Sequence, residues 1–386
     1  MDYERGWKLA RELGVLIVDE RCYKAPKWLF ENVDRYAAYD RNGSGVYLGE
    51  CCSLANRMLN ALAEDAFMIG LEANGDVVRL ASYVPLLAKN GRTQWTPDLI
   101  YFDNERVLPS LNYHVQRMFS MTVGDHVVEV EVEGAPEFRC LPQPFVTIGL
   151  DTGGFEVDFT DISLNGVAAE PVRVVPGDGR VVLPVRTEND GYTVRLAATP
   201  RARTEGHEIG FGVHFGAVGS PDSWEWHFGS WLDRNLTAQY TADVDRDELL
   251  PSIPFCIEIG RTYEIEIRVA EAGRRIEYRL GGVLVHEYAD PGILERRFAA
   301  GLVTGKGRNA LRVVNATAEE TRIELVLGSG RSLAGARVTR LAADPTAGAP
   351  FEPAPAESAV SWLESAVFTV SPYSFTVVEW PGRLGQ

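Results

Sequence analysis

The sequence predicts a multidomain protein in which an α/β part is followed by all-β domains. Up to residue 122, short apolar runs alternate with segments whose apolar residues recur every three or four positions, which is typical of βα units. From about Val127 onward, apolar and polar residues alternate between clusters of turn residues, which is typical of strands. The length of 386 residues also exceeds that of one ordinary domain.

The α/β part contains three βα units in series. Strands are predicted at Val15–Val18, Gly45–Glu50 and Val77–Ser82, and helices at Trp7–Leu13, Pro26–Tyr39 and Leu54–Glu72. The crossovers are long enough for parallel pairing. Because the carboxyl ends of parallel strands meet at one rim, we expect Asp19, Glu20, Glu50 and the Tyr83 segment there.

Glu50 is the strongest candidate for a catalytic residue. It ends a short buried strand that lies between the turn Asn42-Gly43-Ser44 and a helix. In folds built from βα units, the carboxyl end of a strand is where the chemistry takes place.

Several segments match a known enzyme family in order and spacing. They are Ile17-Val18-Asp19-Glu20-Arg21-Cys22-Tyr23, Val46-Tyr47-Leu48-Gly49-Glu50, Leu80-Ala81-Ser82-Tyr83-Val84-Pro85-Leu86, Gln94-Trp95-Thr96-Pro97-Asp98 and, near the C-terminus, Leu311-Arg312-Val313-Val314-Asn315 and Ser371-Pro372-Tyr373-Ser374-Phe375. The chain thereby resembles the second half of the barrel, and the terminal β-sandwich, of α-L-arabinofuranosidases of glycoside hydrolase family 51.

The resemblance implies three domains. Residues 1–122 would be the C-terminal part of a (β/α)8 TIM barrel, with strands six to eight, and residues 296–386 the family's C-terminal β-sandwich. Residues 123–295 resemble a laminin-G or concanavalin-like β-sandwich insert, on the strength of Trp224-Glu225-Trp226-His227-Phe228-Gly229 and a hairpin at Gly281-Gly282. Strands predicted in this part include Tyr192–Leu196 and Tyr263–Val269.

The resemblance also implies an activity, the retaining hydrolysis of terminal α-L-arabinofuranosyl groups from an arabinose-containing glycan. Glu50 stands at the position of the catalytic nucleophile, and Tyr23 could donate a hydrogen bond to it. Gln94 and Trp95 fall on the loop that lines the arabinose pocket in the family. Arg21 stands where the family usually has histidine, near the sugar.

The second carboxyl of a retaining site has no counterpart in the matched segments. Retention needs two carboxyls roughly 5 Å apart, and the family's acid/base glutamate would lie upstream of Met1. We therefore expect an N-terminally truncated enzyme with little or no activity of its own. Asp19 or Glu20 could replace the lost acid; otherwise Asp19 orients the strand end and Glu20 holds a neighbouring side chain.

Two other interpretations remain open. The chain could be a non-catalytic carbohydrate-binding or assembly fragment, with contacts from Trp224, Trp226 or Trp231, although we expect at least two of these rings to fill a core. Alternatively, a second polypeptide could supply the first five strands. The resemblance also implies a homo-oligomer.

Composition excludes several classes of function. The net charge of −16 argues against nucleic-acid and anionic-membrane partners, which need a basic face. No run of eighteen apolar residues and no signal peptide is present, which indicates a cytoplasmic protein. The five cysteines lack metal-binding spacing and are expected to be buried thiols. Neither a metal nor another cofactor is predicted.

Overall fold

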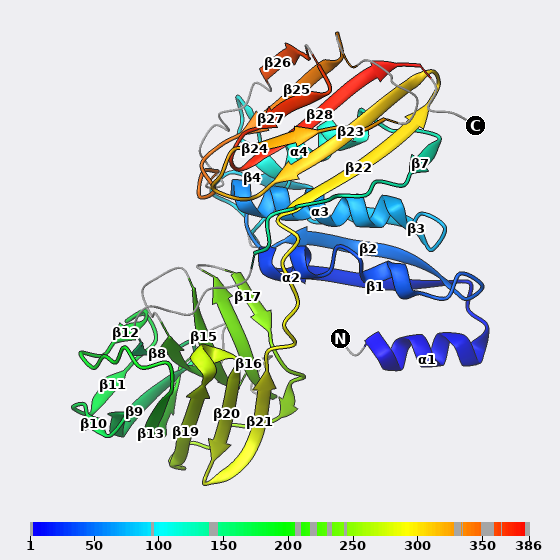
Figure 1. Ribbon diagram of the computed structural model, residues 1–386. Helices are drawn as coiled ribbons and strands as arrows, with labels where there is room; N and C mark the ends of the chain where they lie inside the picture. Colours follow the sequence, from blue (N-terminus) through cyan, green and yellow to red (C-terminus); the bar gives the residue numbers. More distant parts are fainter. Residues whose placement is uncertain are drawn as a thin grey trace. The chain divides into compact units, whose positions relative to one another are not determined.

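The first and last parts of the chain form one folding unit, and the middle part forms another. Unit 1 comprises Met1–Arg139 and Leu294–Gln386, and unit 2 comprises Cys140–Ile293. The computed structural model describes residues 3–93, 96–138, 146–204, 210–216, 222–229, 234–242, 245–327, 333, 335–348, 359–363 and 365–382 (Figure 1). Strands make up most of the regular structure in these residues.

Unit 1 begins with a parallel sheet of three strands in the order β1-β2-β3. The strands are β1 (Ile17–Lys24), β2 (Gly45–Ser53) and β3 (Val78–Tyr83), and the helices before and between them are α1 (Tyr3–Leu13), α2 (Pro26–Glu31), the 3-10 helix η1 (Arg35–Ala38) and α3 (Met58–Ala73). Both registers confirm the predicted parallel pairing. Because β1 and β2 stay paired as far as Lys24 and Ser53, Glu50 lies within its strand and not at the tip.

One helix prediction in unit 1 was wrong, and one helix of this unit was not predicted. The helix expected over Pro26–Tyr39 breaks after Glu31, because the side-chain amide of Asn32 donates to the carbonyl of Trp28 at 2.8 Å and closes the last turn of α2. Helix α4 (Leu111–Ser120) was not predicted, although Ser110 is a recognisable N-cap whose hydroxyl accepts a hydrogen bond from the Tyr113 amide at 3.2 Å.

A small sheet connects β3 to α4, and a larger sheet closes unit 1. The small sheet contains β4 (Leu87–Lys89), β5 (Ile100–Phe102) and β6 (Val107–Pro109). The larger one has the order β26-β25-β28-β23-β22-β7, with β7 (His126–Val128), β22 (Phe298–Gly305), β23 (Arg308–Asn315), β25 (Arg337–Ala342), β26 (Ala359–Trp362) and β28 (Ser374–Pro381). A separate pair, β24 (Thr321–Glu324) and β27 (Val367–Val370), packs on a second hydrophobic cluster of this part. Strand β7, expected in the middle domain, pairs with β22 instead.

Helix α3 lies between the parallel sheet and the larger sheet of unit 1 (Figure 1). Twelve of its 16 residues are buried. The apolar side chains among them share one hydrophobic cluster with Val46 and Leu48 of β2 and with Val303, Val314 and Phe375 of β22, β23 and β28. A helix buried over most of its length needs cover on more than one side, so the C-terminal sheet completes the core of the N-terminal βα units.

Glu64, a buried carboxyl of α3, anchors the helix to the end of β2. Its Oε1 accepts a hydrogen bond from the Ser53 amide at 2.7 Å, and its Oε2 lies 3.5 Å from the Gln116 amide nitrogen on α4. Burial raises the pKa of Glu64 from 4.5 to about 7. Burial also raises the pKa values of Asp65 and Glu72 on the same helix.

Unit 2 consists of two seven-stranded antiparallel sheets. One has the order β10-β9-β13-β19-β20-β21 with β11 beside β9, and the other has the order β12-β8-β14-β15-β16-β17 with β18 beside β16. The strands of the first sheet are β9 (Phe155–Leu164), β10 (Val167–Ala168), β11 (Val172–Val174), β13 (Tyr192–Arg203), β19 (Tyr263–Ala270), β20 (Arg275–Leu280) and β21 (Val283–Ala289), and those of the second are β8 (Thr147–Thr152), β12 (Val181–Val182), β14 (Phe211–Gly216), β15 (Asp222–Gly229), β16 (Asn235–Ala242), β17 (Asp245–Glu248) and β18 (Ile253–Pro254).

The two sheets of unit 2 share a single hydrophobic core, which is the arrangement of a β-sandwich. The predicted strands at Tyr192–Leu196 and Tyr263–Val269 are confirmed within β13 and β19. The predicted hairpin is also confirmed, because Gly281 and Gly282 both have positive φ, at 56° and 79°, and join β20 to β21.

No helix in the described part of the chain is both long and apolar enough to cross a lipid bilayer.

The close approach of α3 to the segment after α2 predicts that Gly70→Ala will destabilise unit 1. A Cβ at Gly70 would lie 1.8 Å from the backbone oxygen of Val33, which cannot rotate away. We expect a loss of about 2 to 3 kcal/mol in the free energy of unfolding, measured by urea unfolding and by hydrogen exchange of α3 peptides. Gly6→Ala in α1, with no atom within 4 Å of its Cβ, is the matched control and should cost nothing. Equal stability of the two variants would contradict this packing.

The raised pKa of Glu64 predicts a pH dependence of stability. Between pH 4.5 and about 7, the folded chain keeps a proton on Glu64 that the unfolded chain has released. The free energy of unfolding should therefore fall as the pH rises through this range, with roughly 3 kcal/mol coming from Glu64. In Glu64→Gln this contribution disappears, while Asp65 and Glu72 keep part of the slope. Urea unfolding at pH 5 and pH 8 measures the difference, and parallel profiles for the two proteins would refute the assignment.

Candidate active site

A one-residue bulge in β2 decides which way Glu50 points. Glu20 of β1 pairs with Leu48, but the next residue, Arg21, pairs with Glu50, so that Gly49 is an extra residue in β2. In a regular strand Gly49 would have stood opposite Arg21 and Glu50 would have faced the helices. The bulge therefore turns Glu50 to the face that carries Arg21 and Tyr23.

The glycine at this bulge lets the Asp19 side chain come close to β2. A Cβ at Gly49 would lie 2.3 Å from Oδ1 of Asp19 and 3.1 Å from its Cγ. The missing side chain leaves room for the Asp19 carboxylate, which lies on the same face of the sheet. Glycine in a strand often marks such a close approach.

Both oxygens of the Glu50 carboxylate have partners. The Tyr23 hydroxyl donates a hydrogen bond to Oε2 at 2.5 Å, and Nη1 of Arg21 lies 3.2 Å from Oε1. Arg21 also faces Asp19, with its Nε 3.7 Å from Oδ2. The Glu50 side chain is 29% exposed, so it is held by its neighbours and still reachable from solvent.

Tyr23 acts as a hydrogen-bond donor throughout the physiological pH range. Its burial and its hydrogen bond to Glu50 raise the pKa of the phenol well above the usual value of 10. The proton therefore stays on Tyr23, which fixes the orientation of the Glu50 carboxylate.

Glu20 does not share the rim with Asp19; as the alternative expectation had it, Glu20 holds neighbouring side chains. It is 2% exposed and lies on the helix side of β1. Its carboxylate accepts hydrogen bonds from Trp7 at 2.6 Å, Tyr36 at 2.8 Å and Tyr39 at 3.0 Å. Successive residues of a strand point to opposite faces, so Glu20 holds the aromatic side chains of α1 and η1 and not a substrate.

The remaining predicted residues are placed as follows. Gln94 and Trp95 lie outside the described residues, as does Trp231. Trp224 and Trp226 are 9% and 0% exposed and belong to the core of unit 2, as we expected for at least two of the three rings.

The expectation of buried thiols holds only in part. Cys22 and Cys52 are buried, and Cys51 is partly buried and lies beside Cys22 in the register of β1 and β2. Cys256 is exposed, because its side chain lies in a segment after β18 that leaves the sheet.

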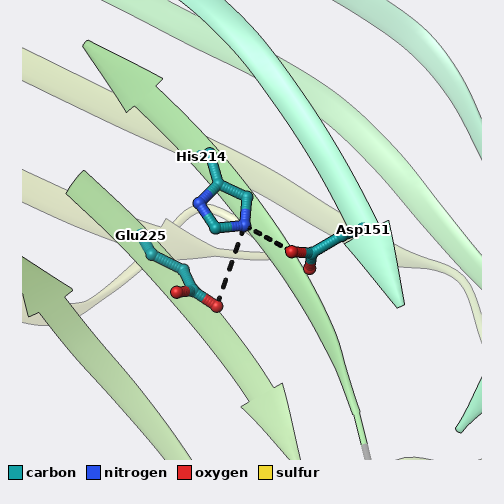
Figure 2. Close-up of side chains that lie close together, drawn as sticks. All are labelled: Asp151, His214 and Glu225. Atoms are coloured by element: carbon teal, nitrogen blue, oxygen red, sulfur yellow. Dashed lines mark hydrogen bonds and ion pairs between the residues drawn. The ribbon is translucent and has the colours of Figure 1, made fainter. Parts of the chain in front are cut away.

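A polar cluster in unit 2 was missed by sequence reasoning. Asp151, His214 and Glu225 come from three adjacent strands, and their carboxylate and imidazole atoms all lie within 4.8 Å of one another (Figure 2). His214 within the apolar strand β14 and the alternating polar residues of β15 were the signal in the sequence. The pairing of the three strands is not visible there.

Comparison with known proteins assigns the chain to a family. The family model of the α-L-arabinofuranosidase C-terminal domain matches residues 51–374. An extracellular exo-α-L-arabinofuranosidase of Streptomyces chartreusis is 34% identical over 375 residues, covering 89% of this chain and 44% of the relative. A probable α-L-arabinofuranosidase A of Aspergillus terreus is 41% identical over 129 residues, covering 31% of this chain and 19% of the relative. The chain thus spans less than half the length of these relatives.

Solved structures give a more distant likeness. An arabinose-bound family 51 α-L-arabinofuranosidase has a TM-score of 0.48 at 15% identity over 95% of this chain and 37% of that one. The arabinose complex of the Thermotoga maritima enzyme also scores 0.48, at 10% identity over 98% of this chain and 56% of that one. Both scores are below 0.5, so the fold rests on the sheets and registers above. Because the family model covers most of the sequence, the chain belongs to the family of α-L-arabinofuranosidase C-terminal domains.

Proposed function

We propose that this chain carries the nucleophile of a retaining α-L-arabinofuranosidase that releases terminal arabinofuranosyl groups from arabinose-containing glycans. The observation that carries the proposal is the Glu50 carboxylate, turned by the bulge toward Tyr23 and Arg21 and held by both. The names of the relatives support the same reaction.

We further propose that β1, β2 and β3 are the last three strands of a (β/α)8 barrel. Among the described residues, β1 and β3 each pair with β2 alone, so the sheet has two free edges. Apolar side chains are exposed on both edge strands, Ile17 at 46% and Leu80 at 59%. Further barrel strands would cover these edges and side chains, whether they come from the same polypeptide or from a second one.

In the proposed reaction, a Glu50 oxygen attacks the anomeric carbon while a second carboxyl protonates the leaving oxygen. The resulting glycosyl-enzyme ester is then hydrolysed by water that the same second carboxyl activates. Tyr23 keeps the attacking carboxylate in one orientation, which lowers the entropic part of the barrier. Arg21 lies between Glu50 and Asp19, so it keeps a negatively charged partner when Glu50 loses its charge in the ester.

The second carboxyl has one described candidate on the same face, Asp19. Glu20 is ruled out by its position on the helix side of β1, where three hydrogen-bond donors hold it. We assign the acid/base role to a carboxyl of the further barrel strands, as the family resemblance implies, with Asp19 as the alternative. Burial of Trp224 and Trp226 removes the main support for a role in carbohydrate binding alone.

Replacement of Glu50 tests the nucleophile assignment. Glu50→Ala should lower the kcat for 4-nitrophenyl α-L-arabinofuranoside by ~10⁴-fold or more. Added azide should restore turnover and give a glycosyl azide of inverted configuration, because azide then attacks in place of the carboxylate. Asp19→Ala is the matched variant on the neighbouring strand. Azide rescue of that variant with retained configuration would make Asp19 the acid/base.

The outcomes of this assay separate the proposals. Full activity of Glu50→Ala, or rescue without inversion, would exclude Glu50 as the nucleophile. Should the purified chain melt cooperatively without turnover, the assay is repeated with added polypeptides that carry the remaining barrel strands. Continued inactivity would favour a non-catalytic module.

Replacement of Tyr23 tests its role as the residue that orients Glu50. Tyr23→Phe removes one hydrogen bond to a charged group, worth about 1.5 to 3 kcal/mol, so we expect kcat to fall by about 10- to 100-fold. KM should change much less, since the interaction is with the nucleophile and not with the sugar. Steady-state kinetics and a thermal melt together measure this. A drop in melting temperature with unchanged kcat would indicate a structural role only.

A further inference from the structure

The second polar cluster lies in unit 2, on the face of the β8-β14-β15 sheet that is turned away from the core. His214 of β14 pairs with Glu225 of β15, and Asp151 of β8 pairs with Gly212 of β14. The intervening residues, Val213 and Trp226 among them, belong to the core on the opposite face. The three polar side chains point toward one another from three adjacent strands (Figure 2).

The geometry of the cluster centres on one imidazole nitrogen. Nε2 of His214 lies 2.8 Å from Oδ2 of Asp151 and 3.9 Å from Oε1 of Glu225. Nδ1 of His214 is buried and has no hydrogen-bond partner among the described residues, so the ring is held through Nε2. Ligand atoms around a tetrahedral zinc ion lie about 3.3 Å from one another. The distances from Nε2 of His214 to the two carboxylate oxygens, 2.8 Å and 3.9 Å, lie on either side of that value.

Gly212 makes room for the three ligand atoms. A Cβ at this position would lie 2.5 Å from Oδ1 of Asp151, 2.8 Å from Oε1 of Glu225 and 3.1 Å from Nε2 of His214. Oxygen and nitrogen atoms of three side chains therefore converge over a backbone position that has no side chain of its own. Glycine in a strand commonly marks a place where a ligand or another group comes close.

The three side chains of the cluster differ in their exposure to solvent. The side chains of His214 and Glu225 are 0% exposed, whereas that of Asp151 is 21% exposed. His227, on the same face of β15, places Nδ1 2.7 Å from Oε1 of Glu225. Such a contact from a neighbouring residue is how proteins orient a ligating carboxylate, and the exposed Asp151 leaves a route from solvent.

We propose that Asp151, His214 and Glu225 bind a divalent transition-metal ion, with zinc as the best match. One imidazole and two carboxylates form a mixed nitrogen and oxygen set, which suits zinc, whereas calcium and magnesium prefer oxygen atoms alone. A divalent cation would place positive charge beside both carboxylates, in addition to their contacts with His214 and His227. Three protein ligands leave a fourth position for water or a substrate oxygen on the side of Asp151.

The site is independent of the proposed hydrolase activity, because its residues belong to unit 2 and Glu50 belongs to unit 1. The competing explanation is a hydrogen-bonded network without metal, in which Asp151 pairs with His214 and Glu225 with His227. A measurement of metal binding, and not of enzymatic activity, distinguishes a metal site from this hydrogen-bonded network.

The test is equilibrium dialysis and calorimetric titration of the full, untagged chain with Zn²⁺ after treatment with a chelator. We expect one equivalent bound per chain with a dissociation constant in the micromolar range or below. Titration with Co²⁺ should give the intense visible absorption of a tetrahedral site. Zn²⁺ should raise the melting temperature, and EDTA should reverse the shift.

Matched variants localise the binding. Glu225→Gln and Asp151→Asn keep the side-chain shape, and each should weaken Zn²⁺ binding by at least about 100-fold, whereas His227→Gln should weaken it by about 10- to 100-fold. His286→Gln replaces a buried histidine of the other sheet of unit 2, and Asp158→Asn replaces a surface carboxylate. Both controls should bind like the wild type. Circular dichroism establishes that each variant is folded.

Three results would overturn the proposal: no saturable Zn²⁺ binding, binding that Glu225→Gln and Asp151→Asn leave unchanged, or binding of Ca²⁺ in preference to Zn²⁺. Should Glu225→Gln fail to fold, Asp151→Asn at the exposed end of the site decides the question.

Discussion

The fold of unit 1 depends on the burial of one helix, α3. Twelve of its 16 residues are buried, so it is not a surface helix. The parallel sheet covers one side and the C-terminal sheet covers another, and all three contribute to one hydrophobic cluster. This requirement explains why the first and last parts of the chain form one unit although 154 residues of unit 2 separate them.

Arg312 links the C-terminal sheet to helices α3 and α4 through polar contacts. Its guanidinium group, carried by β23 and fully buried, pairs with Glu72 of α3 and donates to the carbonyl oxygens of Phe119 at 3.2 Å and Thr122 at 2.6 Å at the end of α4. It also lies 3.8 Å from the centre of the Phe119 ring. Since a buried charge is costly unless it is paired and fully hydrogen-bonded, the contacts of Arg312 fix the spacing of two helices and one sheet in a way that apolar contacts alone do not.

The sequence predicted the presence of most helices and strands, but their first and last residues less well. It also identified candidate site residues better than it predicted their neighbours in space. Recurring apolar residues were enough for α3, and the Gly281-Gly282 turn was enough for the hairpin. Short apolar runs located the three parallel strands, although β1 covers Ile17–Lys24 and not the predicted Val15–Val18. The sequence could not establish the bulge at Gly49, because a one-residue shift in register depends on how two strands pair; the glycine within β2 was the only mark of it in the sequence. The same limit explains why Glu20 was expected at the site and why the Asp151 cluster was missed. Helix α4 was different, since Ser110 and the apolar residues after it were a readable signal.

Glycine has the same structural role at both polar sites. Gly49 lies against the carboxylate of Asp19, and Gly212 lies against that of Asp151; in each case a Cβ would meet the nearest carboxylate oxygen at 2.5 Å or less. Sheets normally keep neighbouring side chains apart by pointing alternate residues to opposite faces. A glycine, with or without a bulge, lets a carboxylate from the adjacent strand move into the space over the backbone and meet its partners. The arrangement of the side chains in both clusters therefore depends in part on two residues that have no side chain.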